Sequence, residues 1–203
     1  MAQVLQAGHV AVITGAGSGF GLALARLLAQ RQMKLALWDV QADALNQAKA
    51  ELTALGHEVM AHQVDVSQPE AVQAAAKAVL AQWGAPHFVF NNAGVAAGGL
   101  IWETSLSDWQ WVMGVNVYGI VNAINAFVPR LLEADQPAHI VNTASMGGLV
   151  TGAYSGPYFT SKFAAVGLSD CLAQDLRTTG KPIGVSVLVP SLINTNIGTS
   201  GRN

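Results

Sequence analysis

Short apolar runs alternate with longer helix-compatible segments along almost the whole chain, and this alternation limits the possible folds more than any other feature. The runs span 9–14, 34–39, 58–64, 87–91, 139–143 and 184–189. Several are apolar at consecutive positions, which is typical of strands covered on both faces. The segments between them span 20–31, 41–55, 68–83, 107–132 and 158–178, with capping boxes at 67–70 and 107–110. The sequence therefore predicts an α/β fold with a doubly wound parallel sheet in three α/β/α layers.

Composition restricts the class of protein. The chain has 203 residues, of which 51% are hydrophobic and 11% charged, and its formal net charge is −2. This length predicts a single domain over 1–203, and the high apolar content excludes intrinsic disorder. No basic stripe is present to neutralise phosphates, so we expect no nucleic-acid partner. The longest apolar stretch, 111–124, is shorter than the roughly 18–20 residues of a membrane span, so we expect no membrane association.

The single cysteine, Cys171, cannot form an internal disulfide, which fits a reducing compartment. We expect it to be a small buried residue of a helix. The first nine residues lack the basic start and cleavage site of a signal peptide. Together these features predict a cytoplasmic protein.

A glycine-rich stretch follows the first run, at 14–21, and precedes a helical segment. Ligands of a parallel sheet bind beyond the carboxyl ends of its strands. Glycines at this place let backbone N–H groups approach a pyrophosphate at the helix N-terminus, although glycines also serve ordinary turns. The predicted cofactor-binding residues of this loop are Gly15, Gly17, Ser18, Gly19, Phe20 and Gly21.

Asp39 ends the second run, at about the separation expected for a carboxylate that binds a ribose 2′-hydroxyl. A carboxylate would repel a 2′-phosphate, and no arginine or lysine stands in the glycine loop or just after Asp39 to compensate. We therefore predict NAD rather than NADP. The alternative interpretation is that Asp39 caps the next helix.

Two further strand ends carry candidate cofactor contacts. After the third run, Asp65 and Val66 could meet an adenine, although Asp65 could also simply terminate the strand. After the fourth run, Asn92, Ala93 and Gly94 would let the main chain pass under a ribose, but a plain turn would look similar.

Tyr158 and Lys162 are four residues apart at the start of a helical segment, so they project from one face. A neighbouring ammonium and the positive end of the helix both favour a phenolate. Such a phenol can exchange a proton with a substrate hydroxyl. A tyrosine at an interface beside an ordinary lysine would show the same spacing.

Two polar residues complete a candidate reacting group. Ser145 lies at the end of the fifth run, where its hydroxyl could hydrogen-bond a substrate oxygen or serve a turn. Asn116 interrupts the long helical segment 107–132, where asparagine is unfavourable. It could kink the helix and hold a water that reaches Lys162, or face solvent.

The combination of these motifs resembles the classical short-chain dehydrogenase/reductase family. The motifs in register are 14–21, Asp65, 91–94, Asn116, Ser145, Tyr158 with Lys162, and Pro190 followed by Thr195. The resemblance implies a Rossmann fold and hydride transfer between C4 of the nicotinamide of NAD and a secondary alcohol or ketone.

The resemblance also implies roles for single residues. Tyr158 would be the acid/base, and Ser145 would polarise the substrate carbonyl. Ser145, Met146 and Tyr158 would contact the substrate. Lys162 would bind the nicotinamide ribose, and Asn116 would hold a water in a proton relay. Pro190 to Thr195 would contact the nicotinamide carboxamide. The alternative function is a catalytically inactive nucleotide-binding or regulatory protein on the same fold.

Two features depart from the family pattern. Ser191 follows Pro190 where the family usually has glycine, and the chain ends at Asn203, some tens of residues early. We therefore expect a last strand and a substrate-covering lid to be missing from this chain, and the alternative is a genuinely short form. Without that segment the sixth strand would be an exposed edge.

The remaining expectations concern the surface and the substrate. Trp102, Trp109 and Trp111 lie in or beside a helix that forms a four-helix interface in this family, so we expect a homodimer or homotetramer. The histidines lack metal-ligand spacing, and those that begin strands, His9, His87 and His139, are expected to be structural. An apolar lining for a small-molecule alcohol or ketone is expected from 96–100, Met146, Gly147, Gly148, Val150 and Thr151.

Overall fold

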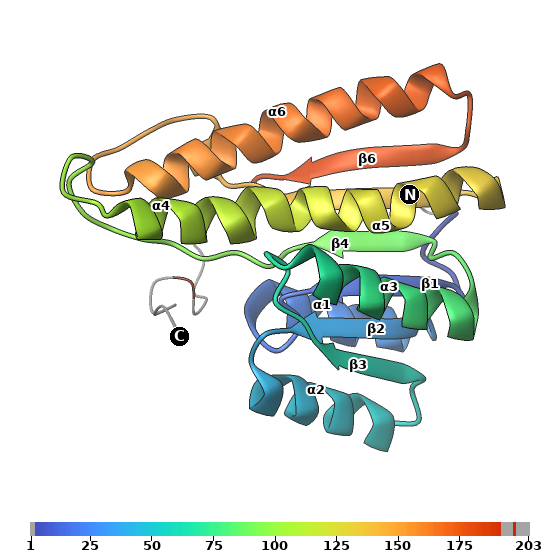
Figure 1. Cartoon of the computed structure of the whole chain (residues 1–203). Helices are drawn as coiled ribbons and strands as arrows, with labels where there is room; N and C mark the ends of the chain where they lie inside the picture. The colour runs from blue at the N-terminus through green and yellow to red at the C-terminus, as the bar shows by residue number, and fades with distance from the viewer. Residues whose placement is uncertain (1–2, 192–196, 198–203) are drawn as a thin grey trace.

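In the computed structural model, the residues that can be described are 3–191 and 197 (Figure 1). The strands are β1 (Val10–Thr14), β2 (Lys34–Asp39), β3 (Val59–Gln63), β4 (Phe88–Asn91), β5 (Ala138–Thr143) and β6 (Ile183–Leu188). The helices are α1 (Gly19–Gln30), α2 (Ala42–Ala54), α3 (Pro69–Trp83), α4 (Leu106–Met113), α5 (Gly119–Ala134) and α6 (Gly156–Thr178). Two short segments, η1 (Gly114–Tyr118) and η2 (Met146–Gly148), complete the elements.

The six strands form one parallel sheet in the order β3-β2-β1-β4-β5-β6. The chain winds outward from β1 in one direction and then, from β4, in the other, so the predicted doubly wound Rossmann arrangement is confirmed. Every residue of β1 and β4 is buried, as expected for central strands covered on both faces. The carboxyl ends of β1, β4 and β5 therefore meet at one edge, where the candidate site lies.

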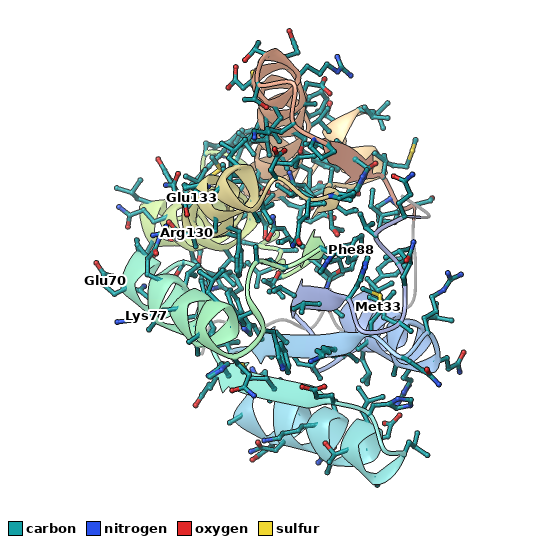
Figure 2. All side chains as sticks on the ribbon, turned by 90° about the vertical axis from the view of Figure 1, so that its right-hand side faces the viewer. Met33, Glu70, Lys77, Phe88, Arg130 and Glu133 are labelled. Carbon is teal, nitrogen blue, oxygen red and sulfur yellow. The ribbon has the colours of Figure 1, made fainter. Side chains whose placement is uncertain are left out.

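Alternate residues of the strands serve two separate cores. One core packs α1 and α2 against one face, and its strand residues include Ile13 and Leu37. The other packs α3 and α5 against the opposite face, and there Trp38 stacks on Phe127. Figure 2 shows charged side chains on the outer faces of α3 and α5, where Arg130 pairs with Glu133 at 2.7 Å. This division gives the three predicted layers.

The starts of two helices differ from the prediction. At α3 the N-cap is Gln68, without a side-chain cap, because the Ser67 hydroxyl donates to Asp65 Oδ1 instead. At α4 the N-cap is Ser105, whose Oγ accepts from the backbone N–H of Asp108. Both predicted capping boxes are therefore wrong, the second by two residues.

The long helical segment predicted at 107–132 exists, but it is not a regular α-helix. A π-helical turn, η1, separates α4 from α5 at Asn116. By length and composition alone, Leu106–Ala134 would be able to cross a membrane. Of an apolar 18-residue part of this stretch, 44% is buried inside the protein.

Three other outcomes concern single residues and one strand. Cys171 is exposed on α6, so the prediction of a buried cysteine is wrong. His9 and His87 stack with ring centroids 3.7 Å apart, and His139 Nε2 pairs with Ser186 Oγ at 2.8 Å, which confirms their structural role. β6 lies at an edge of the sheet and all its residues are half-buried, as predicted for the sixth strand.

Candidate active site

The glycine loop is folded so tightly that a side chain at Gly21 would not fit. A Cβ on Gly21 would overlap the carbonyl oxygen of Gly15, and Gly15 and Gly19 have positive φ of 64° and 51°. The loop leads into α1, whose N-cap Ser18 makes no side-chain cap hydrogen bond and whose first turn holds no acidic residue. The first N–H groups of α1 are thus left for an anionic ligand such as a pyrophosphate.

Asp39 lies directly against the glycine loop. Its Oδ2 accepts from the backbone N–H of Gly17 at 2.8 Å, and its Oδ1 accepts from the N–H of Gln41 at 2.9 Å. The N-cap of α2 is Gln41, so Asp39 does not occupy the cap position. The carboxylate therefore stands beside the cradle, where a ribose next to the pyrophosphate would be placed.

Thr14 joins the glycine loop to the end of β4, a role that the sequence reasoning did not assign. Its Oγ1 accepts from the N–H groups of Asn92 and Ala93 at 2.9 and 3.0 Å. In return, Asn92 Nδ2 donates to the carbonyl of Thr14 at 3.1 Å. A β-branched hydroxyl residue before a glycine loop was the available signal, but only the pairing of β1 with β4 reveals its partners.

Asp65 and Val66 follow β3 as predicted, and both form hydrogen bonds within the protein. Asp65 Oδ1 accepts from the N–H and the hydroxyl of Ser67 at 2.9 and 2.7 Å. These bonds stabilise the turn that leads into α3. Val66 is buried against Gly119 at the start of α5, and its carbonyl accepts from Asn122 Nδ2 at 2.8 Å. Within the described chain, Asp65 Oδ2 forms no hydrogen bond, so it can accept one from an adenine.

Asn116 is buried, so the alternative that it faces solvent is wrong. It lies within the π-helical turn η1, a feature that often occurs at functional sites. Its Oδ1 accepts from the N–H of Val95 at 2.8 Å, and its Nδ2 donates to the Val95 carbonyl and to Ser161 Oγ, both at 2.9 Å. The side chain thus connects the long helix to the loop after β4 and to α6.

Lys162 is a buried cation, only 2% exposed. Its Nζ donates to the carbonyl of Thr143 at the end of β5, at 2.9 Å. Burial lowers the pKa of Lys162 to about 8 because desolvation disfavours the charged form. A Cβ placed on Gly94 would lie 3.5 Å from both Lys162 Nζ and Asn116 Oδ1, so these two groups flank the same glycine.

Tyr158 lies in the first turn of α6, as predicted. Lys162 Nζ is 5.6 Å from the centre of its ring, and the ring is half-buried. The Tyr158 hydroxyl has no hydrogen-bond partner among residues 3–191 and 197, so it can meet a substrate. Ser145 lies nearby, because its Oγ accepts from the N–H of Gly147, and a Cβ on Gly147 would be 3.4 Å from the Tyr158 ring.

The loops expected to line a substrate site do lie together. Gly99 pairs with Ser155 in a parallel bridge, which joins the loop after β4 to the loop before α6. Met146 and Val150 are exposed there, but Gly147 and Gly148 are buried against α6, so the expectation that they line a pocket is wrong. Residues 93–102 and 144–161 contain no charged side chain.

Pro190 follows β6 and approaches the same edge, since its carbonyl accepts from the N–H of Met146 at 2.9 Å. Thr195, the other residue predicted to contact the nicotinamide, lies outside the described residues.

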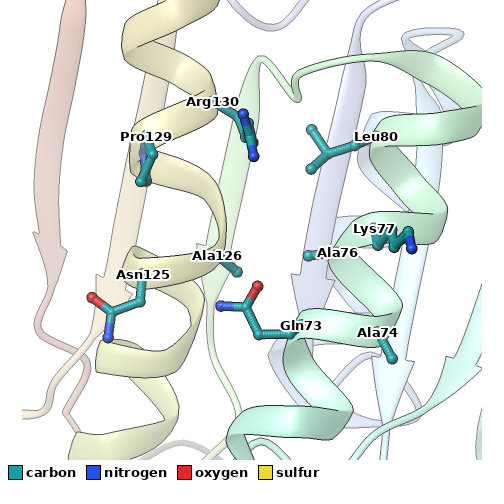
Figure 3. A pocket seen from close by; sticks show the side chains of 9 residues that line it. All are labelled: Gln73, Ala74, Ala76, Lys77, Leu80, Asn125, Ala126, Pro129 and Arg130. Atoms are coloured by element: carbon teal, nitrogen blue, oxygen red, sulfur yellow. The ribbon is translucent and has the colours of Figure 1, made fainter.

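A separate groove of about 450 Å³ runs between α3 and α5 (Figure 3). It is lined by Gln73, Ala74, Ala76, Lys77, Leu80, Asn125, Ala126, Pro129 and Arg130. None of these is a predicted site residue, so the groove is distinct from the candidate active site.

Comparison with known proteins supports this geometry. A family model described as short chain dehydrogenase matches residues 9–203. The chain is 40% identical over 197 residues to a C alpha-dehydrogenase of Sphingobium sp. strain SYK-6, and the match covers 96% of this chain but 63% of that protein. The chain therefore spans less than two thirds of the length of this relative.

Two solved structures are similar over nearly the whole chain. One is a short chain dehydrogenase/reductase from Burkholderia phymatum in complex with NAD, with a TM-score of 0.96, 46% identity and coverage of 98% of this chain and 70% of the other. The second is an alcohol dehydrogenase from the archaeon Thermococcus sibiricus complexed with 5-hydroxy-NADP, with a TM-score of 0.88, 31% identity and coverage of 96% and 82%.

Proposed function

The chain belongs to the short-chain dehydrogenase family, and from this premise we propose that it is an NAD-dependent oxidoreductase acting on a secondary alcohol or ketone. One observation carries the proposal: the Tyr158 hydroxyl is unpartnered within the described chain, and the buried ammonium of Lys162 lies 5.6 Å from the ring. This pair lies at the same sheet edge as the glycine loop.

The residues present fit a nicotinamide dinucleotide. The glycine loop leaves no room for a side chain at Gly21, and it leaves the first N–H groups of α1 for a pyrophosphate. Asp39 would bind the adenosine ribose, and Asp65 Oδ2 would accept from the adenine amino group. Lys162 uses one of its three donors on Thr143, and the others can bind the second ribose. The bound cofactor would accept or donate the hydride at its nicotinamide C4.

The side chains of the chain itself would handle the proton. In the oxidation of an alcohol, the substrate hydroxyl transfers its proton to the Tyr158 phenolate as its carbon loses the hydride. The Lys162 ammonium stabilises the phenolate, and the Ser145 hydroxyl donates to the substrate oxygen. In the reduction of a ketone, Tyr158 returns the proton to the same oxygen.

The substrate we propose is neutral and largely apolar. Residues 93–102 and 144–161, beside Tyr158, carry no charged side chain, and Met146 and Val150 are exposed there. A carboxylate or phosphate on the substrate would therefore find no cation in these loops. Since Cys171 is the single cysteine and no disulfide is required, we propose that the reaction takes place in the cytoplasm.

The proposed reaction is tested by NADH absorbance at 340 nm with a panel of secondary alcohols and ketones. Turnover by the wild-type chain that is lost in Tyr158→Phe supports the proposal. Binding of NADH without turnover of any alcohol would instead indicate a nucleotide-binding protein on this fold.

Substitution of Asp39 is expected to change the choice of cofactor. Asp39→Asn keeps an acceptor for the Gly17 N–H but removes the charge that repels a 2′-phosphate. We expect the ratio of kcat/KM for NADP to that for NAD to rise about tenfold or more, which corresponds to roughly 1.4 kcal/mol. Asp39→Ala, which also removes the loop contact, should in addition weaken binding of both cofactors. An unchanged ratio in Asp39→Asn would show that the carboxylate does not select the cofactor.

We also propose that the chain forms a homodimer or homotetramer through α4, η1 and α6. Large apolar side chains are exposed on these neighbouring elements: Leu106, Tyr118 and Phe163. Such a patch is typical of an association surface. Sedimentation at micromolar concentration is expected to give two or four times the chain mass of 21.1 kDa. Phe163→Glu should reduce this mass, and Leu55→Glu, on the exposed end of α2, should not. A mass of one chain at every concentration would contradict the proposal.

A further inference from the structure

We propose that Ser161 is a positioning residue: its hydroxyl ties Asn116 to the first turn of α6 and so fixes the spacing between Asn116 and the Tyr158–Lys162 pair. The inference rests on the proposed function, because it gives Ser161 a part in the same reaction. In this proposal Ser161 contacts neither substrate nor cofactor, and it acts through Asn116 and Tyr158.

Both hydrogen-bonding capacities of the Ser161 hydroxyl are used inside the protein. The side chain is 0% exposed. Its Oγ donates to the backbone carbonyl of Tyr158 at 2.7 Å and accepts from Asn116 Nδ2 at 2.9 Å. Since a hydroxyl has one proton to donate, the bond to Tyr158 leaves Ser161 to act only as an acceptor toward Asn116. The direction of each bond is therefore fixed.

These bonds close a ring of contacts around the reacting groups. Asn116 also exchanges two hydrogen bonds with the backbone of Val95, at 2.8 and 2.9 Å. Val95 follows Gly94, against which Lys162 Nζ and Asn116 Oδ1 both lie. Lys162 in turn follows Ser161 in α6. Ser161 is the residue through which this ring passes from the long helix to α6.

The π-helical turn is the reason why a hydrogen bond from Asn116 to Ser161 matters. A single turn of π-helix is rare and interrupts the regular hydrogen bonding of the helix around it. Asn116 lies in that turn, on an element other than the one that holds Tyr158 and Lys162. A displacement of about 1 Å between groups that must act together can lower a rate by about a hundredfold. The tie from Ser161 holds the two elements in one arrangement.

The same helix supplies a matched control in Ser169, two turns further along α6. It is 1% exposed, its Oγ donates to the carbonyl of Ala165 at 2.6 Å, and it accepts from Asn142 Nδ2 at 2.9 Å. Ser169 thus makes the same set of bonds as Ser161, but its partner is on β5 rather than in the π-helical turn. The loss of either hydroxyl should destabilise the protein similarly, and only the loss of Ser161 should affect the reaction.

The first experiment measures amide hydrogen exchange in the full chain without cofactor. In Ser161→Ala we expect exchange in peptides covering 114–118 to be about tenfold faster than in wild type, because opening of the turn becomes easier. In Ser169→Ala those peptides should exchange at the wild-type rate. Equal exchange of 114–118 in both variants and wild type would overturn the proposal, and this result does not depend on turnover.

The second experiment separates positioning from general stability by kinetics. Ser161→Ala is expected to lower kcat about tenfold while KM stays within about twofold, and Ser161→Thr, which keeps the hydroxyl, should restore most of the loss. Ser169→Ala should keep the wild-type kcat. In the Asn116→Ala background, Ser161→Ala should add no further loss, since Ser161 acts through Asn116.

The outcomes that contradict the proposal are distinct from failure of the proposed function. An equal fall of kcat in Ser161→Ala and Ser169→Ala would show that Ser161 has only a structural role. If wild type turned over no alcohol, the proposed function would fail, and the exchange of 114–118 would still decide whether Ser161 holds the π-helical turn.

Discussion

Removal of the Tyr158 hydroxyl is expected to lower kcat by about 10²–10⁴-fold, the usual contribution of a positioned acid/base. In Tyr158→Phe, the ring keeps its place beside Lys162 Nζ, but no group remains to exchange a proton with the substrate oxygen. The cofactor contacts of the glycine loop and Asp39 are untouched. We therefore expect NADH to bind with an affinity within a few fold of wild type.

Pre-steady-state and steady-state measurement of NADH absorbance would check the loss, and quenching of protein fluorescence would check NADH binding. Tyr118→Phe is the matched control, since it removes a phenolic hydroxyl that lies in η1, outside the candidate active site. A Tyr158→Phe rate within about tenfold of wild type would remove Tyr158 from the acid/base role. Loss of NADH binding together with turnover would instead point to a disturbed fold.

Replacement of Lys162 by methionine is expected to affect both the reaction and the pH dependence of stability. The pKa of Lys162 is lowered from 10.5 to about 8 by burial. Between these two values the unfolded chain holds a proton that the folded chain has lost, so raising the pH favours folding. Relative to Lys162→Met, the free energy of unfolding of wild type should therefore rise by about 3 kcal/mol from pH 8 to pH 10.5.

Below pH 8 the contribution of Lys162 to the free energy of unfolding no longer changes with pH. There Lys162 is charged in the folded chain, and the burial of its ammonium destabilises wild type. The variant should consequently be at least as stable as wild type at pH 7, but with kcat lower by about a hundredfold or more because the phenolate loses its cation. Urea unfolding at intervals between pH 7 and pH 10.5 measures the difference. Lys77→Met, at an exposed lysine of α3, should give a curve parallel to wild type. Parallel curves for Lys162→Met would show that Lys162 titrates normally.

The cost of Lys162 shows how the site conflicts with stability. A buried ammonium bonded to one carbonyl and a π-helical turn are both unfavourable in a core, and both lie at the same sheet edge. The ring of contacts through Ser161, Asn116 and Val95 keeps them in place. We expect similar supporting hydrogen bonds wherever a reaction needs a buried cation.

Features of the candidate site that depend on neighbours in sequence could be predicted. Tyr158 and Lys162 share a face because residues four apart in a helix do so, whatever surrounds them. The glycine loop was recognisable because it stands between a strand and a helix, where residues without a Cβ permit a tight turn. Apolar residues at consecutive positions likewise predicted strands of a parallel sheet covered on both faces.

Features that depend on packing could not be predicted in the same way. The exposed Cys171 was expected to be buried, because composition does not say which face of a helix meets the rest of the protein. The N-cap of α4 is Ser105 rather than Ser107, although both serines fit a capping pattern. Only the structure shows which serine caps the helix: the Ser105 Oγ accepts from the backbone N–H of Asp108.

The sequence by itself determined the fold class, the order of the elements and the set of residues at the carboxyl edge of the sheet, because these follow from local periodicity and chain geometry. Only the tertiary structure decided that Asn116 is buried in a π-helical turn, that Ser161 receives its amide and that Lys162 donates to Thr143. These partners are 19 to 45 residues apart in the chain. Such contacts form only when whole helices pack on the sheet, and no local pattern specifies their register.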